Sequence, residues 1–134
     1  MADAVTTTVL AENKNVYEII LTNKSDGTGE SAVLKVDVSA LTPAAAEVWL
    51  TDVEYATAGM SVELYWDADT DVPFLFIPPD QHGRFDFRES FRGCVENSSG
   101  AGKTGDVKLT TVGHTAGDTY WIRLRFKKLQ TAEV

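Results

Sequence analysis

The sequence predicts an all-β fold, a single-domain β-sandwich or jelly roll of about eight or nine strands with one short helical turn. Three observations lead to this prediction. Apolar residues alternate with polar ones along most of the chain, which is the period of a half-buried strand. The alternating segments are short and recur about every 8–14 residues, between glycine, proline and aspartate clusters. Only one segment carries helix signals, and 134 residues suit one domain spanning residues 1–134.

Three strands are predicted in the first 40 residues. Ala4–Leu10 is rich in β-branched residues and alternates. Asn15–Asn23 is apolar on both faces in its middle, which predicts a central strand. Ala32–Ser39 alternates cleanly, and this predicts an inward and an outward set: Leu34, Val36 and Val38 inward, Lys35 and Asp37 outward.

The predicted helical turn and two further strands follow. Thr42 and Pro43 suit the cap and first position of a helix, and Thr42–Glu47 has length for one or two turns. Val48–Thr57 and Met60–Trp66 are predicted strands on either side of a break at Gly59. Alternation places four residues of the first of these strands on one side: Trp49, Thr51, Val53 and Tyr55.

Four more strands are predicted in the second half. Val72–Ile77 is flanked by prolines, which favours an edge strand or one that switches sheets. Gly83–Phe91, Asp106–Val112 and Thr119–Lys128 alternate, the last most clearly. The first few residues and residues 130–134 are expected to be flexible tails. The predicted core draws on seven residues: Val36, Leu64, Trp66, Phe85, Leu109, Ile122 and Leu124.

Composition and charge exclude several classes of protein. The net charge of -8 and the pI near 4.6 are opposite in sign to what duplex binding needs, so no nucleic-acid partner is expected. No apolar stretch approaches the roughly 18 residues of a membrane span, so no membrane partner is expected. The N-terminus lacks a basic region and an apolar region, so no secretory signal is expected. A single cysteine, Cys94, fits a reducing compartment such as the cytoplasm.

A glycine-rich loop offers the strongest apparent enzyme motif. Gly100–Thr104 ends like a phosphate-binding loop, but Asn97 stands where that pattern needs glycine. A helix must follow such a loop to present its amides to phosphate, whereas Gly105 and a predicted strand follow here. We therefore expect a flexible loop, no catalytic residue and no cofactor. The rival hypothesis is an enzyme or nucleotide-binding protein that uses Lys103 and Asp67.

An acidic loop offers candidate metal ligands. Asp67, Asp69 and Asp71 alternate as three carboxylates, and oxygen ligands of this kind suit calcium. The EF-hand pattern fails, because Val72 replaces the glycine and Pro78 the final glutamate. The sequence favours a solvated acidic loop and no bound metal, with these three aspartates as the candidates if an ion binds.

The last predicted strand carries a candidate partner interface. Trp121, Arg123, Arg125 and Lys127 should share its outer face, and Trp and Arg are enriched where proteins meet. Two alternatives remain open for this face. The tryptophan could be covered by the stems of the arginines, or it could be a platform for a sugar ring, a role that Trp49 could also fill.

Charge is divided unevenly along the chain. Residues 1–67 hold 11 acids and 3 lysines, a balance of -8, and residues 68–134 hold 9 acids and 9 bases, a balance of zero. The two halves therefore offer complementary patches that could orient an association between copies. The alternative interpretation is a solvated acidic surface.

The chain resembles small β-sandwich structural proteins of tailed phages, of the capsid decoration or cement type. The resemblance covers roughly residues 40–128 and rests on the order of these segments: Leu41–Ala44, Val53–Tyr55, Leu64–Asp67, Phe85–Phe87, Arg92–Gly93, Gly105–Thr111, Tyr120–Leu124 and Lys127–Lys128. It implies no catalytic residues and a protein of the virion that stabilises the head.

This resemblance implies partners and a location. The expected partners are the phage major capsid protein and further copies of the chain, in a homo-oligomer for which the resemblance suggests a trimer. The expected location is the capsid surface of the virion, after synthesis in the host cytoplasm. The alternative is a carbohydrate- or receptor-binding β-sandwich module, for which calcium at the acidic loop would be the expected cofactor.

Overall fold

The computed structural model describes residues 4–25, 27, 29–41, 45, 47–87, 104–113 and 115–129. These residues form nine strands and one short 3-10 turn, η1 (Val38–Ala40). The strands are β1 (Ala4–Glu12), β2 (Val16–Lys24), β3 (Val33–Val36), β4 (Glu47–Ala58), β5 (Ser61–Trp66), β6 (Val72–Ile77), β7 (His82–Asp86), β8 (Val107–Val112) and β9 (Thr119–Leu129). Within the described ranges, no helix has the length and hydrophobicity of a membrane span.

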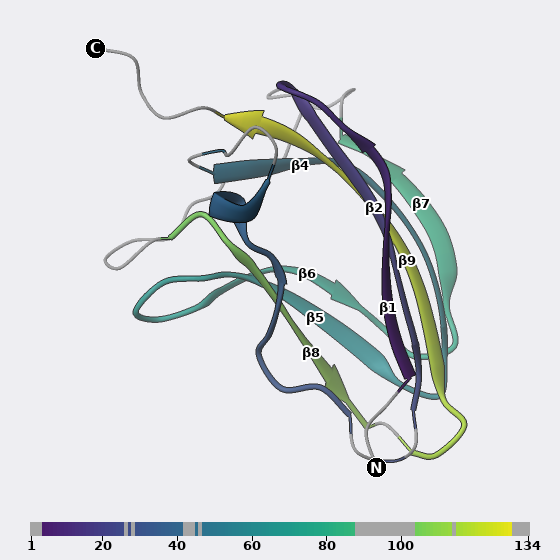
Figure 1. Ribbon diagram of the computed structural model, residues 1–134. Helices are drawn as coiled ribbons and strands as arrows, with labels where there is room; N and C mark the ends of the chain where they lie inside the picture. Colours follow the sequence, from purple (N-terminus) through teal and green to yellow (C-terminus); the bar gives the residue numbers. More distant parts are fainter. Residues whose placement is uncertain are drawn as a thin grey trace.

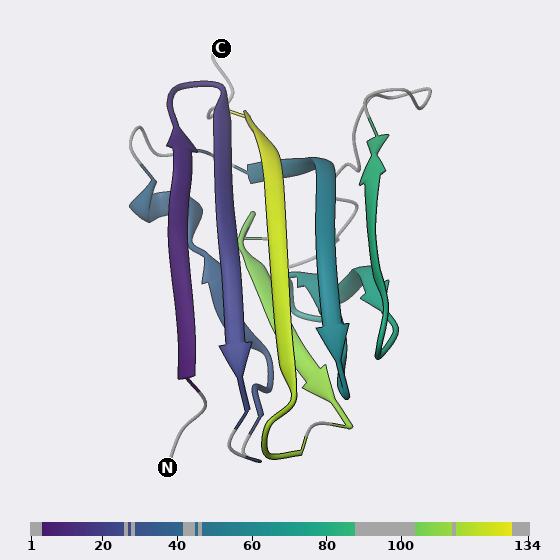
Figure 2. The same ribbon diagram turned by 90° about the vertical axis from the view of Figure 1, so that its right-hand side faces the viewer.

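The strands form two antiparallel sheets that pack face to face (Figure 1). The five-stranded sheet A has the order β1-β2-β9-β4-β7, and the four-stranded sheet B has the order β3-β8-β5-β6. Figure 2 views the molecule from the side of sheet A, with β1 and β7 at its two edges. The predicted all-β sandwich is confirmed, and so is the edge position of the strand that prolines flank, β6.

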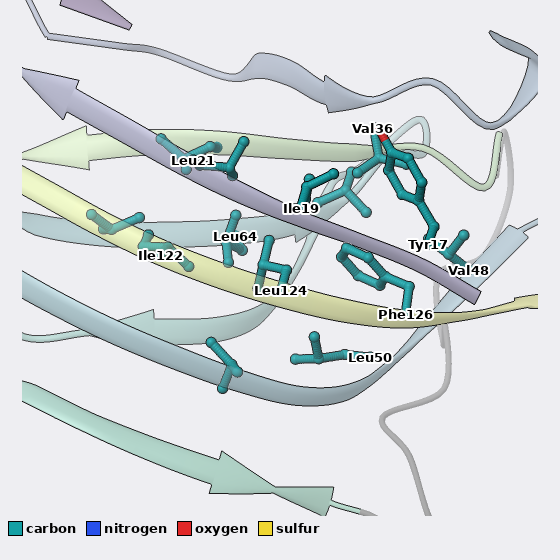
Figure 3. Packing of buried hydrophobic residues seen from close by; sticks show 14 of the residues in the cluster. Tyr17, Ile19, Leu21, Val36, Val48, Leu50, Leu64, Ile122, Leu124 and Phe126 are labelled. Atoms are coloured by element: carbon teal, nitrogen blue, oxygen red, sulfur yellow. The ribbon is translucent and has the colours of Figure 1, made fainter. Parts of the chain in front are cut away.

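The core lies between the sheets, where alternate side chains of the interior strands meet. Ile19 and Leu21 of β2 and Ile122, Leu124 and Phe126 of β9 point toward sheet B (Figure 3). Six of the seven predicted core residues are almost completely buried. These six residues are Val36, Leu64, Trp66, Leu109, Ile122 and Leu124.

The prediction for the seventh, Phe85, is wrong. Its side chain is 52% exposed, because β7 is the outermost strand of sheet A among the described residues and pairs there with β4 alone. Phe85 stacks against Tyr55 and Phe87, with ring centroids 6.3 and 6.2 Å away. Alternation identified the face of the strand correctly, since Phe85 pairs with the buried Val53, but a strand at an edge is only partly covered.

Two β-bulges overturn the alternation that the sequence predicts. In β3, Lys35 is the extra residue, so Leu34 is exposed and the lysine side chain is buried, the reverse of the prediction. In β4, Thr51 is the extra residue, so Trp49 and Val53 do not share a face. Figure 2 shows β4 bending sharply near its start, the part of the strand where this bulge lies.

The short helix of the described residues, η1, lies before the segment that the sequence predicts to be helical. After Val36 the chain leaves sheet B and makes η1, where the side chain of Asp37 accepts a hydrogen bond from the amide of Ser39. The segment predicted to be helical, Thr42–Glu47, lies mostly outside the described residues, and its last residue begins β4.

A buried glutamate joins the two sheets at one end of the core. Glu30, on the chain between β2 and β3, accepts hydrogen bonds from Tyr120 (2.6 Å) and Asn23 (2.8 Å) of sheet A. Its other carboxylate oxygen lies 2.5 Å from the ammonium of Lys35 in sheet B. The backbone amide of Glu30 donates to the hydroxyl of Thr111, also in sheet B, at 2.9 Å. We call these five residues the Glu30 cluster.

We expect Glu30→Ala to lower the free energy of unfolding by about 3–5 kcal/mol, because it leaves the buried Lys35 ammonium unpaired. The pair Glu30→Gln with Lys35→Met keeps an acceptor for Tyr120 and removes the buried charge, so it should recover at least half of that loss. Urea unfolding followed by tryptophan fluorescence measures both. A loss below about 1 kcal/mol for Glu30→Ala would contradict the proposed link between the sheets.

Candidate interaction face on sheet A

The four residues of the predicted interface lie together on the outer face of β9. Tyr120, Ile122, Leu124 and Phe126 alternate with them and are buried. Trp121, Arg123 and Arg125 are half-buried and Lys127 is exposed. Strand β9 lies between β2 and β4, so these residues occupy the middle of sheet A. We call this surface the outer face of sheet A.

Three carboxylates from the neighbouring strands surround Arg123. Its guanidinium lies 2.5 Å from Glu18 of β2 and 3.2 and 3.3 Å from Asp52 and Glu54 of β4. Each contact uses a different nitrogen of the guanidinium, whose fixed fork of donors suits several acceptors at once. Arg123 therefore binds its own sheet, and its side chain is only 14% exposed.

The bulge in β4 creates this arrangement. With Thr51 as the extra residue, Asp52 pairs with Arg125 and turns to the outer face, where its side chain is nevertheless almost completely buried. Partial burial acts to lower the pKa of Arg123, but the hydrogen bonds to the three carboxylates outweigh it, so the pKa is raised. The guanidinium is thus a fixed charge that holds β2, β9 and β4 together.

The other cations of this face are placed differently. The ammonium of Lys127 lies 5.9 Å from the centroid of the Trp49 ring, in cation–π range. The indole nitrogen of Trp49 donates to Glu47 at 2.5 Å. Among the described residues, the side chain of Arg125 makes no ion pair. On β9, Arg125 and Lys127 are therefore the cations that can meet acidic groups of a partner.

The three aspartates of the acidic loop do not converge on one point. The ammonium of Lys108 lies 2.7 Å from Asp67 and 3.5 Å from Asp71, while Asp69 is exposed. Asp67 also accepts a hydrogen bond from the hydroxyl of Thr104 at 2.7 Å. A lysine thus occupies the place between two of the candidate ligands. Within the described ranges, no three acidic, histidine or cysteine side chains are grouped to hold a metal.

The hydrogen bonds to Asp67 change its acidity. Those from Lys108, the larger effect, and from Thr104 lower the pKa of its carboxyl below the ordinary value of 3.8. The same contact raises the pKa of Lys108. This ion pair joins the β5–β6 connection to β8, so the acidic loop has a structural role within sheet B.

Only the last residue of the motif that resembles a phosphate-binding loop, Thr104, lies among the described residues. Lys103 and most of the glycine-rich loop lie outside the described residues, as does Cys94. Thr104 binds Asp67, and β8 follows Gly105, so a strand stands where a phosphate-binding loop needs a helix. No pocket is found in the part of the chain that the structure describes.

The residues that hold the guanidinium of Arg123 could not be identified from the sequence. Glu18, Asp52 and Glu54 carried no signal of their own, because their partner Arg123 lies 69–105 positions away. The cross-strand register that joins them could not be read from local alternation. Once the strand order is known, the acidic residues on the two strands beside β9 identify the carboxylates that bind Arg123.

Comparisons with known proteins give no relative from which a function could be transferred. No family model matches the chain, and no curated protein or solved structure shows significant similarity to it.

We expect Arg123→Ala to lower the free energy of unfolding by about 2–3 kcal/mol, because the buried carboxylate of Asp52 loses its cationic partner. Arg125→Ala is the matched control on the same strand and face, and should change stability by less than about 1 kcal/mol. Urea unfolding of both variants measures the two losses of free energy of unfolding. Equal losses would show that the three carboxylates do not depend on Arg123.

The Asp67–Lys108 pair should give stability a dependence on acid. Because the pKa of Asp67 is lower in the folded chain than in the unfolded one, the ionised carboxylate stabilises the fold above about pH 4. This contribution is lost as the pH falls through the folded-state pKa. Wild type should therefore exceed Asp67→Asn in stability at pH 7 and lose that advantage in urea unfolding toward pH 2.5. The exposed control Asp69→Asn should follow wild type at every pH.

Proposed function

We propose that this protein is a non-enzymatic structural protein of a tailed-phage virion, a decoration or cement protein on the outside of the capsid. The ordered segments of the sequence that resemble such proteins support this proposal. Its partner would be the major capsid protein, and it would be made in the host cytoplasm. The observation that carries the proposal is the outer face of sheet A, on which cations and a tryptophan stand on an otherwise acidic protein.

The chemistry of this face suits a protein partner. Arg123 is bound within the sheet and keeps the three central strands in register. Trp121 offers apolar area beside it, and Arg125 and Lys127 offer charge. Faces of this composition, with an aromatic anchor and arginine, are typical of protein interfaces.

The charge distribution would orient the docked protein. The first half of the chain, with its charge balance of -8, repels an acidic capsid face, whereas Arg125 and Lys127 attract carboxylates at one place. A capsid repeats the same docking surface many times, so individually weak contacts can hold if neighbouring copies also touch. Self-association belongs to this proposal, and the trimer is the form that the resemblance implies.

The carbohydrate- or receptor-binding alternative depends on an aromatic ring with a free face. Lys127 lies over one face of the Trp49 ring, which makes Trp121 the better candidate for stacking on a sugar. Trp121 is half-buried on a face rich in hydrogen-bonding side chains. Binding of glycans on an array that is lost in Trp121→Ala, without capsid binding, would favour this alternative.

The test is cosedimentation of the purified protein with capsids that lack it. We expect wild type to bind, and we expect Arg125→Glu with Lys127→Glu to weaken binding at least about tenfold, because two charges that face the partner are reversed. Arg123 is left intact, since its loss should destabilise the fold.

The matched control is Lys14→Glu with Ala40→Glu and Thr70→Glu, which changes the net charge by the same amount at exposed positions outside the strands of sheet A. This control should bind nearly as wild type does. A wild-type protein that fails to sediment with such capsids would contradict the decoration role. Equal weakening by both sets of substitutions would place the contact elsewhere on the molecule.

A further inference from the structure

The outer edge of β1 differs from the other sheet edges. The two sheets have four edge strands among the described residues, namely β1, β7, β3 and β6. Natural proteins block such edges with charges, prolines, bulges or short strands, because unpaired backbone groups otherwise recruit another strand. β7 carries Arg84 and Asp86, β3 has four residues and includes Lys35, and β6 carries Pro73.

β1 has few of these protections. It is nine residues long, and no charged residue or proline occurs before its last residue, Glu12. The described side chains from Val5 to Leu10 are all exposed. Within the described part of the chain it pairs with β2 on one side only, and Figure 2 shows it at the outer edge of sheet A. A bulge at Leu10 interrupts the register, so regular strand geometry covers Ala4–Val9.

The regular part of β1 is complementary to itself. Val5–Val9 reads Val-Thr-Thr-Thr-Val, the same sequence in both directions from Thr7. When two such strands run antiparallel with Thr7 opposite Thr7, each Val5 faces a Val9 and each Thr6 faces a Thr8. Valine pairs and threonine pairs directly opposite each other stabilise antiparallel strands.

We propose that two copies of this chain pair through β1, antiparallel about a two-fold axis at Thr7, so that two copies of sheet A form one continuous sheet of ten strands. A two-fold contact of this kind is isologous, since the same strand serves both partners. The partner is a second copy of the chain because the strand matches itself in sequence and length. This inference goes beyond the proposed virion role and does not depend on it, and its two-fold contact is a different form of self-association from the trimer that the resemblance implies.

Charge favours this edge for contact between copies. The chain carries a net charge of -8, so most pairs of surfaces on two copies would oppose carboxylates. The segment Ala4–Ala11 contains no charged residue, and the paired strands therefore oppose no like charges. Strand pairing buries a small area compared with a large obligate interface, so we expect a dissociation constant of about 1–100 µM.

Cysteine substitution tests the register. In an antiparallel pair, residues directly opposite each other have Cα atoms about 4.5–5.5 Å apart, which a disulfide can span. In a chain with Cys94→Ser, Thr7→Cys should therefore form an intermolecular disulfide in most of the protein under mild oxidation. Thr6→Cys and Thr8→Cys should each cross-link poorly alone, since like positions are about 8 Å apart. A mixture of these two variants should cross-link with each other.

Sedimentation equilibrium from about 1 to 500 µM tests the association itself. Wild type should pass from monomer to dimer, and Thr7→Lys should raise the dissociation constant at least about tenfold, since it opposes two like charges at the axis. Ala40→Lys, at an exposed position of η1, is the control and should dimerise as wild type does. Circular dichroism and thermal melting verify that the variants fold.

Three results would overturn the proposal. One is a wild-type protein that stays monomeric at the highest concentration, and another is a dimer that Thr7→Lys leaves unchanged. The third is cross-linking of Thr6→Cys or Thr8→Cys alone as efficient as that of Thr7→Cys, which would exclude the two-fold register. The cysteine series uses small side chains, so it remains decisive if the lysine variant fails to fold.

Discussion

The structure depends most on one buried carboxylate, that of Glu30. Hydrophobic contact between two sheets is not directional, so it leaves their relative position weakly specified. Glu30 receives hydrogen bonds from Asn23 and Tyr120 of sheet A and an ion pair from Lys35 of sheet B. A charge buried to this extent is stable only with its partners in place, so arrangements that move one sheet past the other carry a high cost.

The same rule explains why the charges on the outer face of sheet A are unequal in role. Arg123 and Asp52 are largely buried, and each is satisfied by the other and by the neighbouring strands. Such a pair orders the sheet and leaves little for a partner. Arg125 and Lys127 lie on the same strand with fewer constraints from their own chain. Composition alone would treat the two arginines as equivalent, and their functions differ because their neighbours differ.

Bulges decide which polar groups enter the interior. Four of the strand pairings contain one, with Leu10, Lys35, Thr51 and Phe74 as the extra residues. The bulge at Lys35 brings a lysine inward to Glu30, and the bulge at Thr51 turns Asp52 outward to Arg123. The bulge at Phe74 lets that ring stack on Trp66, with centroids 3.8 Å apart. These irregularities are where the sheets acquire their specific contacts.

The sequence by itself determined the strand positions and the inward residues of the strands without a bulge of their own, such as Ile122 and Leu124 in β9, because alternation is a local property. Tertiary structure alone decided that Phe85 is exposed at an edge and that the side chain of Lys35 is buried. It also placed Val53 and Trp49 on opposite faces of sheet A. The tertiary structure also determines which residues bind Glu30 and Arg123. Those outcomes depend on which strand lies alongside, and that choice is set by residues up to about a hundred positions away.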